Sequence, residues 1–351
     1  MRERLARLTL QLVDVPSPSR EEGALADVVA REVPLPLRHR DAETLLFAAP
    51  RTGKPLVLLA GHLDTVPAQG NLPGRLVDGI VHGLGAADMK AGLAVMVELA
   101  RWVHAEAPPL AVDFAFLFFP REELPAQESA VPALLATGLV DDAGLVVVLE
   151  PTANAIQAGC LGHLSATVVF EGTSGHSARP WLADNAIDRA VRALGGVVGR
   201  PPRDVALAGL TFREVLSVTE IHGGIAVNVV PDRVEAGISY RYAPDRTPAE
   251  AEAELARLLG GSGRLERLSN SPPARVVADT PLVRALREAG GLAVEPKQAW
   301  TPVAEFSAHG LDAVNLGPGD PRFAHARDEQ VDAAALERTF EALRRFALGS
   351  V

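Results

Sequence analysis

The chain has 351 residues, of which 48% are hydrophobic and 22% charged, and its formal net charge is −10. At ~150 residues per domain, this length predicts about two domains of ordinary globular composition. The longest apolar runs, such as Phe114–Phe119, fall far short of the ~20 residues that span a bilayer, so we expect no membrane partner. The basic residues form no block that would grip a phosphate backbone, so we expect no nucleic-acid partner either.

The N-terminus and the cysteine content bear on location and on metal chemistry. Residues Met1–Leu5 lack the apolar stretch and the small-residue cleavage site of a secretion signal, so we expect a cytoplasmic protein. Cys160 is the single cysteine, which leaves neither an internal disulfide nor a thiolate-rich zinc cluster. Any metal would therefore have to be held by histidine, aspartate and glutamate.

Helix and strand patterns alternate in the outer parts of the chain. Short continuous apolar runs that end at polar or Gly/Pro clusters are typical of buried strands, and apolar residues at helical spacing lie between them. This alternation predicts an α/β fold with a mostly parallel sheet sandwiched by helices. In chain order, the expected elements are a helix at Arg2–Leu12, a strand at Leu56–Ala60, a helix at Ala91–Val103, a strand at Phe114–Phe119, a helix at Val131–Ala136, strands at Leu145–Leu149 and Ala313–Leu316, and a helix at Ala333–Phe346.

The pattern changes from about Leu161 onward. Two stretches alternate apolar and polar residues with a period of two, which is typical of strands with one solvated face, and two others have helical spacing. The strands are expected at Ser165–Phe170 and Val234–Tyr240, the helices at Asn185–Val198 and Pro248–Leu259, and an exit linker at Leu268–Arg275. We therefore expect a domain formed by residues 1–160 and 275–351, with a smaller α+β domain inserted at 161–274.

Histidine and carboxylate residues gather where the predicted strands end. His62 and Asp64 follow the first strand, Glu122 and Glu123 the second, and Glu150 the third, while Asp88 precedes a helix. Ligands of open α/β sheets bind outside the carboxyl ends of the strands, so these segments are expected to meet at one edge. His62 and Asp64 share a face of their strand, so one could bind a metal while the other orients the imidazole ring.

Each of these residues also has an ordinary interpretation. A histidine after a strand is commonly a surface or core residue, Asp88 could cap a helix, and Glu122-Glu123 could form a solvated turn. Several buried carboxylates side by side are costly without a cation, however. Their joint occurrence after apolar strands therefore favours a metal site.

The chain contains the motifs Gly61-His62-Leu63-Asp64-Thr65-Val66-Pro67, Gly85-Ala86-Ala87-Asp88-Met89-Lys90-Ala91-Gly92 and Glu122-Glu123. These three motifs resemble those of the co-catalytic zinc amidohydrolases, the metallopeptidase family that includes succinyl-diaminopimelate desuccinylase, acetylornithine deacetylase, aminoacylase and carboxypeptidase G. The resemblance extends over nearly the whole chain, through Gly175–Pro180, Asp184–Ile187, Asn228–Asp232 and a late His325.

The resemblance implies two divalent metal ions, which we expect to be zinc, with cobalt or manganese as alternatives. It implies that one ion is held by His62, Asp88 and Glu150 and the other by Asp88, Glu123 and His325, with Asp88 bridging. It also implies that Glu122 is the general base for a water that bridges the metals, and that Asp64 steadies His62.

The inserted domain is expected to act as a lid and as a dimerisation domain. On spacing alone, His176 would be an exposed loop histidine. The resemblance implies instead that His176 reaches across a homodimer to stabilise the oxyanion in the partner's site. Arg179, Asn228 and Arg241 are candidates to pair with substrate carboxylates, although an arginine on a polar strand is also commonly a solvated surface residue.

The segments Trp300–Ser307 and Ala313–His325 look like the desuccinylase branch of the family. Pro302 stands where that branch has aspartate, and Ser129-Ala130 lies near its Asn-Gly pair. The resemblance implies a small acylated amino acid as substrate and removal of succinate from N-succinyl-LL-2,6-diaminopimelate, a step of lysine and peptidoglycan biosynthesis. The alternatives are a deacetylase of N-acetyl amino acids, a dipeptidase or carboxypeptidase, and a metal-dependent binding protein without catalysis. A pure binder would have no use for Glu122.

Overall fold

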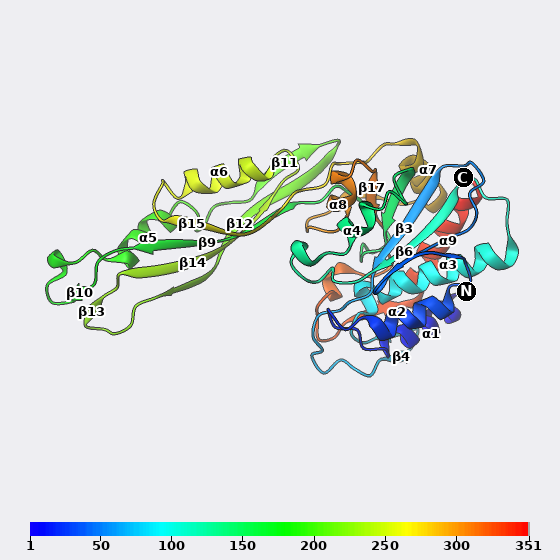
Figure 1. Cartoon of the computed structure of the whole chain (residues 1–351), viewed down its shortest axis with the longest axis horizontal. Helices are drawn as coiled ribbons and strands as arrows, with labels where there is room; N and C mark the ends of the chain where they lie inside the picture. The colour runs from blue at the N-terminus through cyan, green and yellow to red at the C-terminus, as the bar shows by residue number, and fades with distance from the viewer. Residues whose placement is uncertain (350–351) are drawn as a thin grey trace. The chain divides into compact units, whose positions relative to one another are not determined.

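A computed structural model describes residues 1–349 of the chain (Figure 1). The described chain divides into two compact units. Unit 1 contains residues Met1–Gly159, Val277–Glu295 and 305–349, and unit 2 contains Cys160–Val276 and Pro296–Ala304. Each unit has a sheet of its own and is described separately below.

Unit 1 is built on an eight-stranded sheet whose central strands β6, β3, β7 and β17 run parallel. The flanking pairs of β1 with β2, β2 with β6, and β8 with β17 are antiparallel. The expected α/β fold with a mostly parallel sheet is thereby confirmed. In order across the sheet, the strands are β1 (Leu37–Asp41), β2 (Thr44–Ala48), β6 (Asp113–Phe119), β3 (Leu56–His62), β7 (Ala143–Val148), β17 (Ala313–Asn315), β8 (Ile156–Ala158) and β16 (Val294–Pro296).

Helices cover this sheet. Every residue of β3 and β6 is buried, and α3 lies against both strands, while α1 and α9 pack on α3 (Figure 1). A separate small sheet contains β4 (Arg75–Val77), β5 (Ile80–His82) and β18 (Gln330–Asp332). The α-helices are α1 (Arg2–Val13), α2 (Gly23–Glu32), α3 (Ala91–Glu106), α4 (Val131–Leu135), α7 (Pro281–Gly290), α8 (Val303–Ala308) and α9 (Ala333–Leu348). None of the helices in the described chain is long and apolar enough to cross a membrane.

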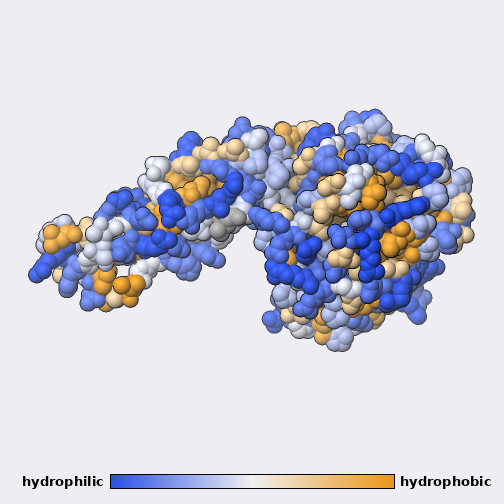
Figure 2. All heavy atoms as spheres, viewed as in Figure 1, coloured by the Kyte–Doolittle hydropathy of each residue, from blue (hydrophilic) through white to orange (hydrophobic). Residues whose placement is uncertain are grey.

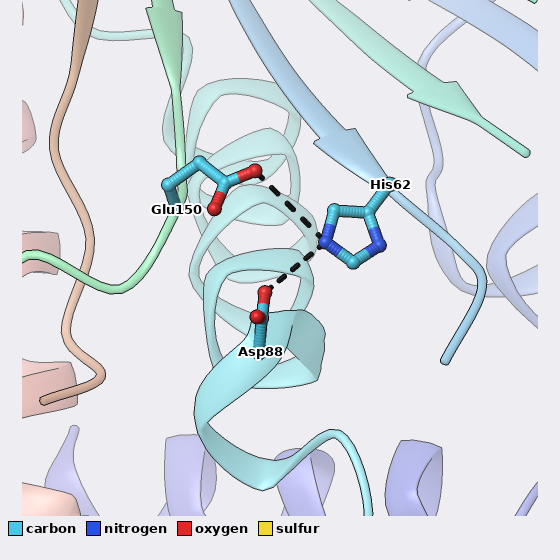
Figure 3. A group of neighbouring side chains, drawn as sticks. All are labelled: His62, Asp88 and Glu150. Carbon is cyan, nitrogen blue, oxygen red and sulfur yellow. Dashed lines mark hydrogen bonds and ion pairs between the residues drawn. The ribbon is translucent and has the colours of Figure 1, made fainter. Parts of the chain in front are cut away.

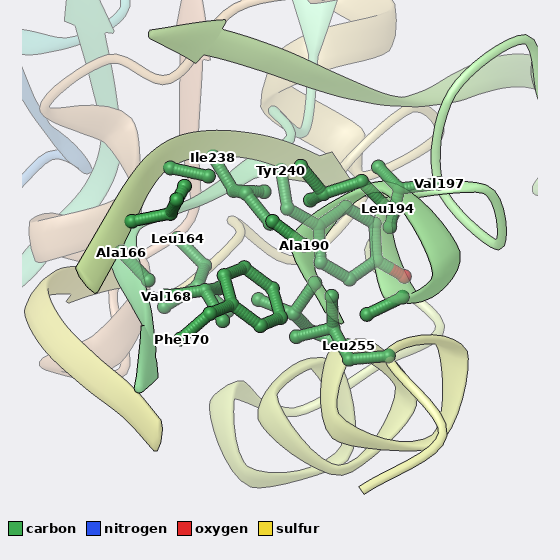
Figure 4. Packing of buried hydrophobic residues seen from close by; sticks show 14 of the residues in the cluster. Leu164, Ala166, Val168, Phe170, Ala190, Leu194, Val197, Ile238, Tyr240 and Leu255 are labelled. Atoms are coloured by element: carbon green, nitrogen blue, oxygen red, sulfur yellow. The ribbon is translucent and has the colours of Figure 1, made fainter. Parts of the chain in front are cut away.

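Unit 2 contains a five-stranded antiparallel sheet with helices α5 (Ala186–Leu194) and α6 (Pro248–Leu258) on one face. Every second residue of β14 is buried against these helices, as the alternating pattern of that strand predicts (Figure 4). In order across the sheet, the strands are β11 (Arg203–Leu207), β12 (Leu210–Gly223), β14 (Arg233–Tyr242), β9 (Gly162–Glu171) and β15 (Arg264–Ser271), and a separate pair is formed by β10 (Gly175–His176) and β13 (Val229–Val230).

Two expectations for this region are wrong, and two strands were missed. The first half of the expected linker Leu268–Arg275 belongs to β15, which pairs with β9 through Ser271 and stops before Pro272-Pro273, where the backbone donor is missing. Helix α5 ends at Leu194 rather than Val198 because Gly195-Gly196 follows it. Strands β11 and β12 were not expected, because their short polar and apolar runs lack a steady period.

Candidate metal centre

Five predicted ligands come from separate segments of unit 1 and meet at the carboxyl end of its parallel strands. His62 is the last residue of β3, Glu123 follows β6, and Glu150 follows β7. Asp88 lies in a short kinked helix, η1 (Ala86–Lys90), directly before α3, and the peptide bond after Asp88 is cis. His325 follows a 3₁₀ turn at Pro321–Phe323 and has a left-handed backbone conformation with φ of 60°.

Asp88 lies between the two histidines. Its Oδ1 is 3.1 Å from Nε2 of His62, and its Oδ2 is 3.5 Å from Nε2 of His325. On the His62 side, Oε1 of Glu150 is 3.9 Å from the same Nε2 (Figure 3). On the other side, Oε1 of Glu123 is 2.8 Å from Nε2 of His325. The carboxylate of Asp88 is thus shared by two groups of side chains.

These two groups have the composition of a dinuclear metal site. His62, Asp88 and Glu150 form one group and Asp88, Glu123 and His325 the other, with the ligand atoms of each group within 4.8 Å of one another. Imidazole nitrogen and carboxylate oxygen suit zinc and other divalent transition metals. The donor set therefore fits a pair of divalent cations, with Asp88 available to both.

The electrostatics of the cluster favour cations. Burial raises the pKa of Asp88, but the histidines beside it outweigh that effect and hold its pKa below the usual range. The carboxylates of Asp88 and Glu123 raise the pKa of His325 to about 10. Burial lowers the pKa of His62, yet hydrogen bonds with Asp64 and Asp88 more than compensate and raise it. Bound divalent cations would supply the positive charge that protons on the two imidazoles otherwise supply to these carboxylates.

Glu122 lies beside this cluster but belongs to neither group that contains Asp88. A third set of neighbouring atoms comprises His62, Glu122 and Glu123. Burial raises the pKa of Glu122 well above the ordinary glutamate value, and repulsion by Glu150 adds to the effect. Glu122 is thus an acid whose charged form is disfavoured, next to five potential ligands.

Asp64 contacts the imidazole of His62 more closely through its backbone than through its side chain. Nδ1 of His62 is 3.0 Å from the backbone carbonyl oxygen of Asp64 and 3.5 Å from Oδ1 of its side chain. The carboxylate of Asp64 accepts hydrogen bonds from the backbone N–H groups of Glu122 and Glu123, each at 3.0 Å, and from the hydroxyl of Ser19 at 2.8 Å. Asp64 therefore connects the end of β3 to the turn that carries two site residues.

Glu329 stabilises the Asp88 segment through hydrogen bonds, although no sequence pattern indicates this role. This buried side chain accepts hydrogen bonds from the backbone N–H groups of Gly85, Ala87 and Asp88 at 2.8 to 2.9 Å. Burial raises its pKa to about 7. Its surroundings in the sequence, Arg-Asp-Glu-Gln, are those of an ordinary polar turn, so only the fold identifies it.

Gly92 allows the Asp88 segment to approach the end of β7. A Cβ atom at this position would lie 2.4 Å from the carbonyl oxygen of Leu149, which is far too close for any side chain. The first turn of α3 can therefore lie directly against the residue before Glu150. This close packing explains the second glycine of the Asp88 motif in physical terms.

The predicted residues of unit 2 fall into two places. His176 lies in β10 opposite Val229 of β13, the backbone N–H of Arg179 donates to the carbonyl of His176, and that of Ser177 donates to the carbonyl of Asn228. His176, Arg179 and Asn228 are therefore neighbours, and all three are exposed. Arg241 is near the opposite end of β14, beside β9, and the structure does not bring it to them.

The fold and the clustered imidazole and carboxylate groups are those of a metal-dependent hydrolase, and comparison with known proteins agrees. Residues 58–349 match peptidase family M20/M25/M40. The chain is 39% identical to DapE of Mycobacterium tuberculosis H37Rv, over 97% of both chains. It is 35% identical to succinyl-diaminopimelate desuccinylase of Corynebacterium glutamicum, over 92% of this chain and 90% of that one. The chain belongs to peptidase family M20/M25/M40, and the expected family and metal-dependent hydrolase class are confirmed.

Two solved structures have folds similar to that of this chain. A tripeptidase of Staphylococcus aureus has a TM-score of 0.80 at 19% identity, with 99% of this chain and 98% of that one covered. The YXEP protein of Bacillus subtilis, described as a dinuclear metal binding peptidase from the M20 family, has a TM-score of 0.72 at 16% identity, with 99% and 97% covered. At these identities the likeness concerns the fold.

Proposed function

We propose that this protein hydrolyses N-succinyl-LL-2,6-diaminopimelate to succinate and the free diamino acid, in the cytoplasm, as a step of lysine and peptidoglycan biosynthesis. The observation that carries the proposal is the 35% identity, over nine-tenths of both chains, to a relative named for this reaction. The clustered carboxylates and imidazoles of unit 1 supply the chemistry that such an amide hydrolysis requires.

The proposal includes two zinc ions, with cobalt or manganese as alternatives. His62, Asp88 and Glu150 would hold one ion, and Asp88, Glu123 and His325 the other. When bound, such a pair polarises the amide carbonyl and makes water more acidic. Because the side chains of Asp88 and Glu123 already face the imidazole nitrogens, the ligands need little rearrangement.

Glu122 is the proposed general base. Its carboxylate takes a proton from the water that attacks the amide carbonyl and later gives that proton to the departing nitrogen, so that the C–N bond breaks with a neutral amine as leaving group. Glu122 is suited to this role because it lies next to the ligand cluster without belonging to either group that contains Asp88. Its backbone N–H donates a hydrogen bond to the carboxylate of Asp64, which helps to hold Glu122 in place.

The residues of unit 2 are proposed to receive the substrate. His176 would stabilise the oxyanion that forms when water adds to the carbonyl. Arg179 and Asn228, its neighbours, would bind polar groups of the amino acid part. Arg241 would bind a carboxylate, since a guanidinium offers two parallel donors to such a group.

Unit 2 also supports a homodimer. Strand β12 pairs with β11 only through Glu214, so among the described strands its stretch from Val215 to Gly223 has a neighbour on one side only. Figure 2 shows hydrophobic surface at the end of unit 2 that carries β10 and β13. A second copy could pair edge to edge with β12 and cover this surface about a two-fold axis. The exposed hydrophobic residues of unit 2 are Trp181, Leu182, Ile187, Val191, Val198, Ile221, Ile225 and Val227.

Two experiments test the dimer. Light scattering should give twice the chain mass for the wild type and the chain mass for Val191→Glu, whereas Val77→Glu, at an exposed position of unit 1, should stay dimeric. Mixing the separately inactive Glu122→Gln and His176→Ala proteins should restore part of the activity, because a mixed dimer holds one complete site. A monomeric wild type, or a mixture without activity, would contradict a shared site.

The substrate is tested by amine release from the purified, metal-loaded protein. N-succinyl-diaminopimelate, N-acetylornithine and a dipeptide are compared at equal concentration, with Glu122→Gln as the control for contaminating hydrolases. We expect kcat/KM to be at least tenfold higher for the succinyl substrate. Preferential turnover of N-acetylornithine would make the protein a deacetylase, and preferential turnover of the dipeptide would make it a peptidase.

A further inference from the structure

Glu305 is a partly buried acidic residue of unit 1 that the proposed reaction does not use. It lies in the first turn of α8, and its Oε2 accepts a hydrogen bond of 3.0 Å from the hydroxyl of Ser129. Ser129 belongs to the segment between Glu123, a proposed metal ligand, and α4. The contact therefore joins α8 to the segment that leaves the candidate metal centre.

The first turn of α8 lies at the same edge of the sheet as the candidate metal centre. Helix α8 leads into β17, which runs parallel to β7. A helix that leads into a parallel strand runs antiparallel to it, so its first turn lies toward the carboxyl end of that strand. Glu150 follows β7 at this end. Glu305 and Ser129 are thus on the side of unit 1 where a substrate of the metal centre would lie.

The carboxylate of Glu305 has fewer partners than other buried carboxylates of unit 1. Among the described residues, its Oε1 accepts no hydrogen bond and no basic side chain forms an ion pair with it. Better-partnered carboxylates are Glu98 with Arg4 and Arg101, Asp113 with Arg51 and Thr52, and Glu329 with three backbone N–H groups. One oxygen of Glu305 is therefore open to a donor from outside the chain.

Two ordinary roles do not account for this carboxylate. A negative charge in the first turn stabilises a helix, but a fully exposed side chain would supply it without the cost of burial. A hydrogen bond from Ser129 connects two segments, but the oxygen of a neutral amide would accept it as well. A carboxylate that is partly withdrawn from water and has an open oxygen is suited to an incoming cation.

The donor set favours an ammonium group over a metal ion. Calcium takes ~6–8 oxygen ligands, far more than Glu305 and Ser129 offer. An ammonium group has three donors and no acceptor, so a carboxylate and a hydroxyl oxygen suit it. The proposed substrate carries such a group, because one of the two amino groups of its diaminopimelate part forms the scissile amide and the other is free.

We propose that Glu305 is a specificity-determining residue, which together with Ser129 receives the free ammonium group of the substrate's amino acid part. This ammonium receptor rests on the proposed amide hydrolysis and adds to it a selection for amino acids with a second basic nitrogen. Acylated amino acids without that nitrogen would leave the charge of Glu305 unpaired.

The test measures binding to metal-loaded Glu122→Gln protein, in which the loss of the proposed base prevents turnover. The ligands are N-succinyl-LL-2,6-diaminopimelate and N-succinyl-L-2-aminopimelate, which has the same carbon chain but lacks the second amino group. Calorimetry is done at pH 8, where Glu305, with a pKa of about 7, is mostly ionised. We expect an added Glu305→Gln to weaken binding of the diamino ligand about tenfold, the usual cost of losing a hydrogen bond to a charged group, and to leave the monoamino ligand unchanged.

Two further variants control for charge and for position. Glu305→Asp keeps the charge and should retain a preference for the diamino ligand. Glu295→Gln, at an exposed position of β16, should bind both ligands like the Glu122→Gln parent. A side chain with a merely structural role would affect both ligands alike. An equal loss for both ligands in Glu305→Gln, or no loss for either, would overturn the ammonium receptor.

A second pair of ligands separates this inference from the proposed function. N-acetyl-L-ornithine and N-acetyl-L-norvaline differ in the same way, by one amino group, but carry an acetyl group. If Glu305→Gln selectively loses N-acetyl-L-ornithine while the wild type does not cleave N-succinyl-diaminopimelate, the ammonium receptor holds and the desuccinylase assignment fails. If the wild type cleaves that substrate while Glu305→Gln keeps both preferences, the function holds and the receptor fails.

Discussion

The side-chain oxygen Oδ1 of Asp64 accepts a hydrogen bond of 3.0 Å from the backbone N–H of Glu122. The other oxygen accepts one from Glu123, so one carboxylate at the end of β3 fixes the turn after β6. Hydrogen bonds from N–H groups to a charged carboxylate are stronger than neutral ones. The position of the proposed base is therefore set by the main chain and by a neighbouring strand.

Asp64→Asn should lower kcat by about tenfold or more. An amide has one acceptor oxygen and carries no charge, so one of the two N–H groups would lose its partner and the turn would loosen. The measurement is kcat at saturating metal. Ser19→Ala removes only the third contact of Asp64 and should retain most of the activity. Equal activity of Asp64→Asn and the wild type would show that the turn is held by other means.

Glu122→Gln should lower kcat by ~10²–10⁴-fold, the range typical of a lost general base. Metal content should stay at the wild-type level, because neither ligand group that contains Asp88 includes Glu122. Steady-state kinetics and elemental analysis of the same preparation check both parts. Loss of metal from this variant would mean that Glu122 is a ligand, and turnover within about tenfold of the wild type would remove it as the base.

Glu329→Gln should weaken metal binding by ~10–100-fold, as is typical for residues that orient metal ligands. The wild-type carboxylate accepts three backbone N–H groups of the segment that ends at Asp88, whereas glutamine offers a single acceptor oxygen. Competition with a chelating indicator measures the change. Glu337→Gln, on the accessible side of α9, is the matched control. A wild-type metal affinity in Glu329→Gln would show that the segment keeps its shape without this carboxylate.

Glu305 should make unit 1 less stable as the pH rises. Burial raises its pKa to about 7 from the ordinary 4.5, against a hydrogen bond from Ser129 that lowers it. Between these two values the folded state binds more protons than the unfolded state, so the free energy of unfolding falls with increasing pH. At pH 8 the ionised Glu305 side chain lowers the free energy of unfolding by at most about 3 kcal/mol.

Glu305→Gln removes this titration. We expect the variant to unfold at a higher temperature than the wild type at pH 8 and at nearly the same temperature at pH 5. Glu295→Gln, at an exposed position of β16, serves as the control for loss of a surface charge. A difference between Glu305→Gln and the wild type that is the same at both pH values would contradict the expected burial of a titrating carboxyl group.

Local patterns explain which parts of the fold could be predicted. The buried strands of unit 1 are continuous apolar runs, so their ends, and with them His62, Glu123 and Glu150, could be found from the sequence. The pairing of β15 with β9 depends on contacts between distant segments, and no local pattern marks it. The role of Glu329 likewise follows only from the fold, which places its carboxylate against backbone N–H groups of a segment more than 200 residues earlier in the chain.

The metal content of the purified chain shows whether Asp88 serves two metal positions at once. We expect two divalent ions per wild-type chain, neither of them retained by Asp88→Ala, and one each retained by His62→Ala and His325→Ala. Elemental analysis after dialysis against trace metal gives these values. A wild-type chain that binds no divalent ion, or an Asp88→Ala protein that keeps both, would contradict it.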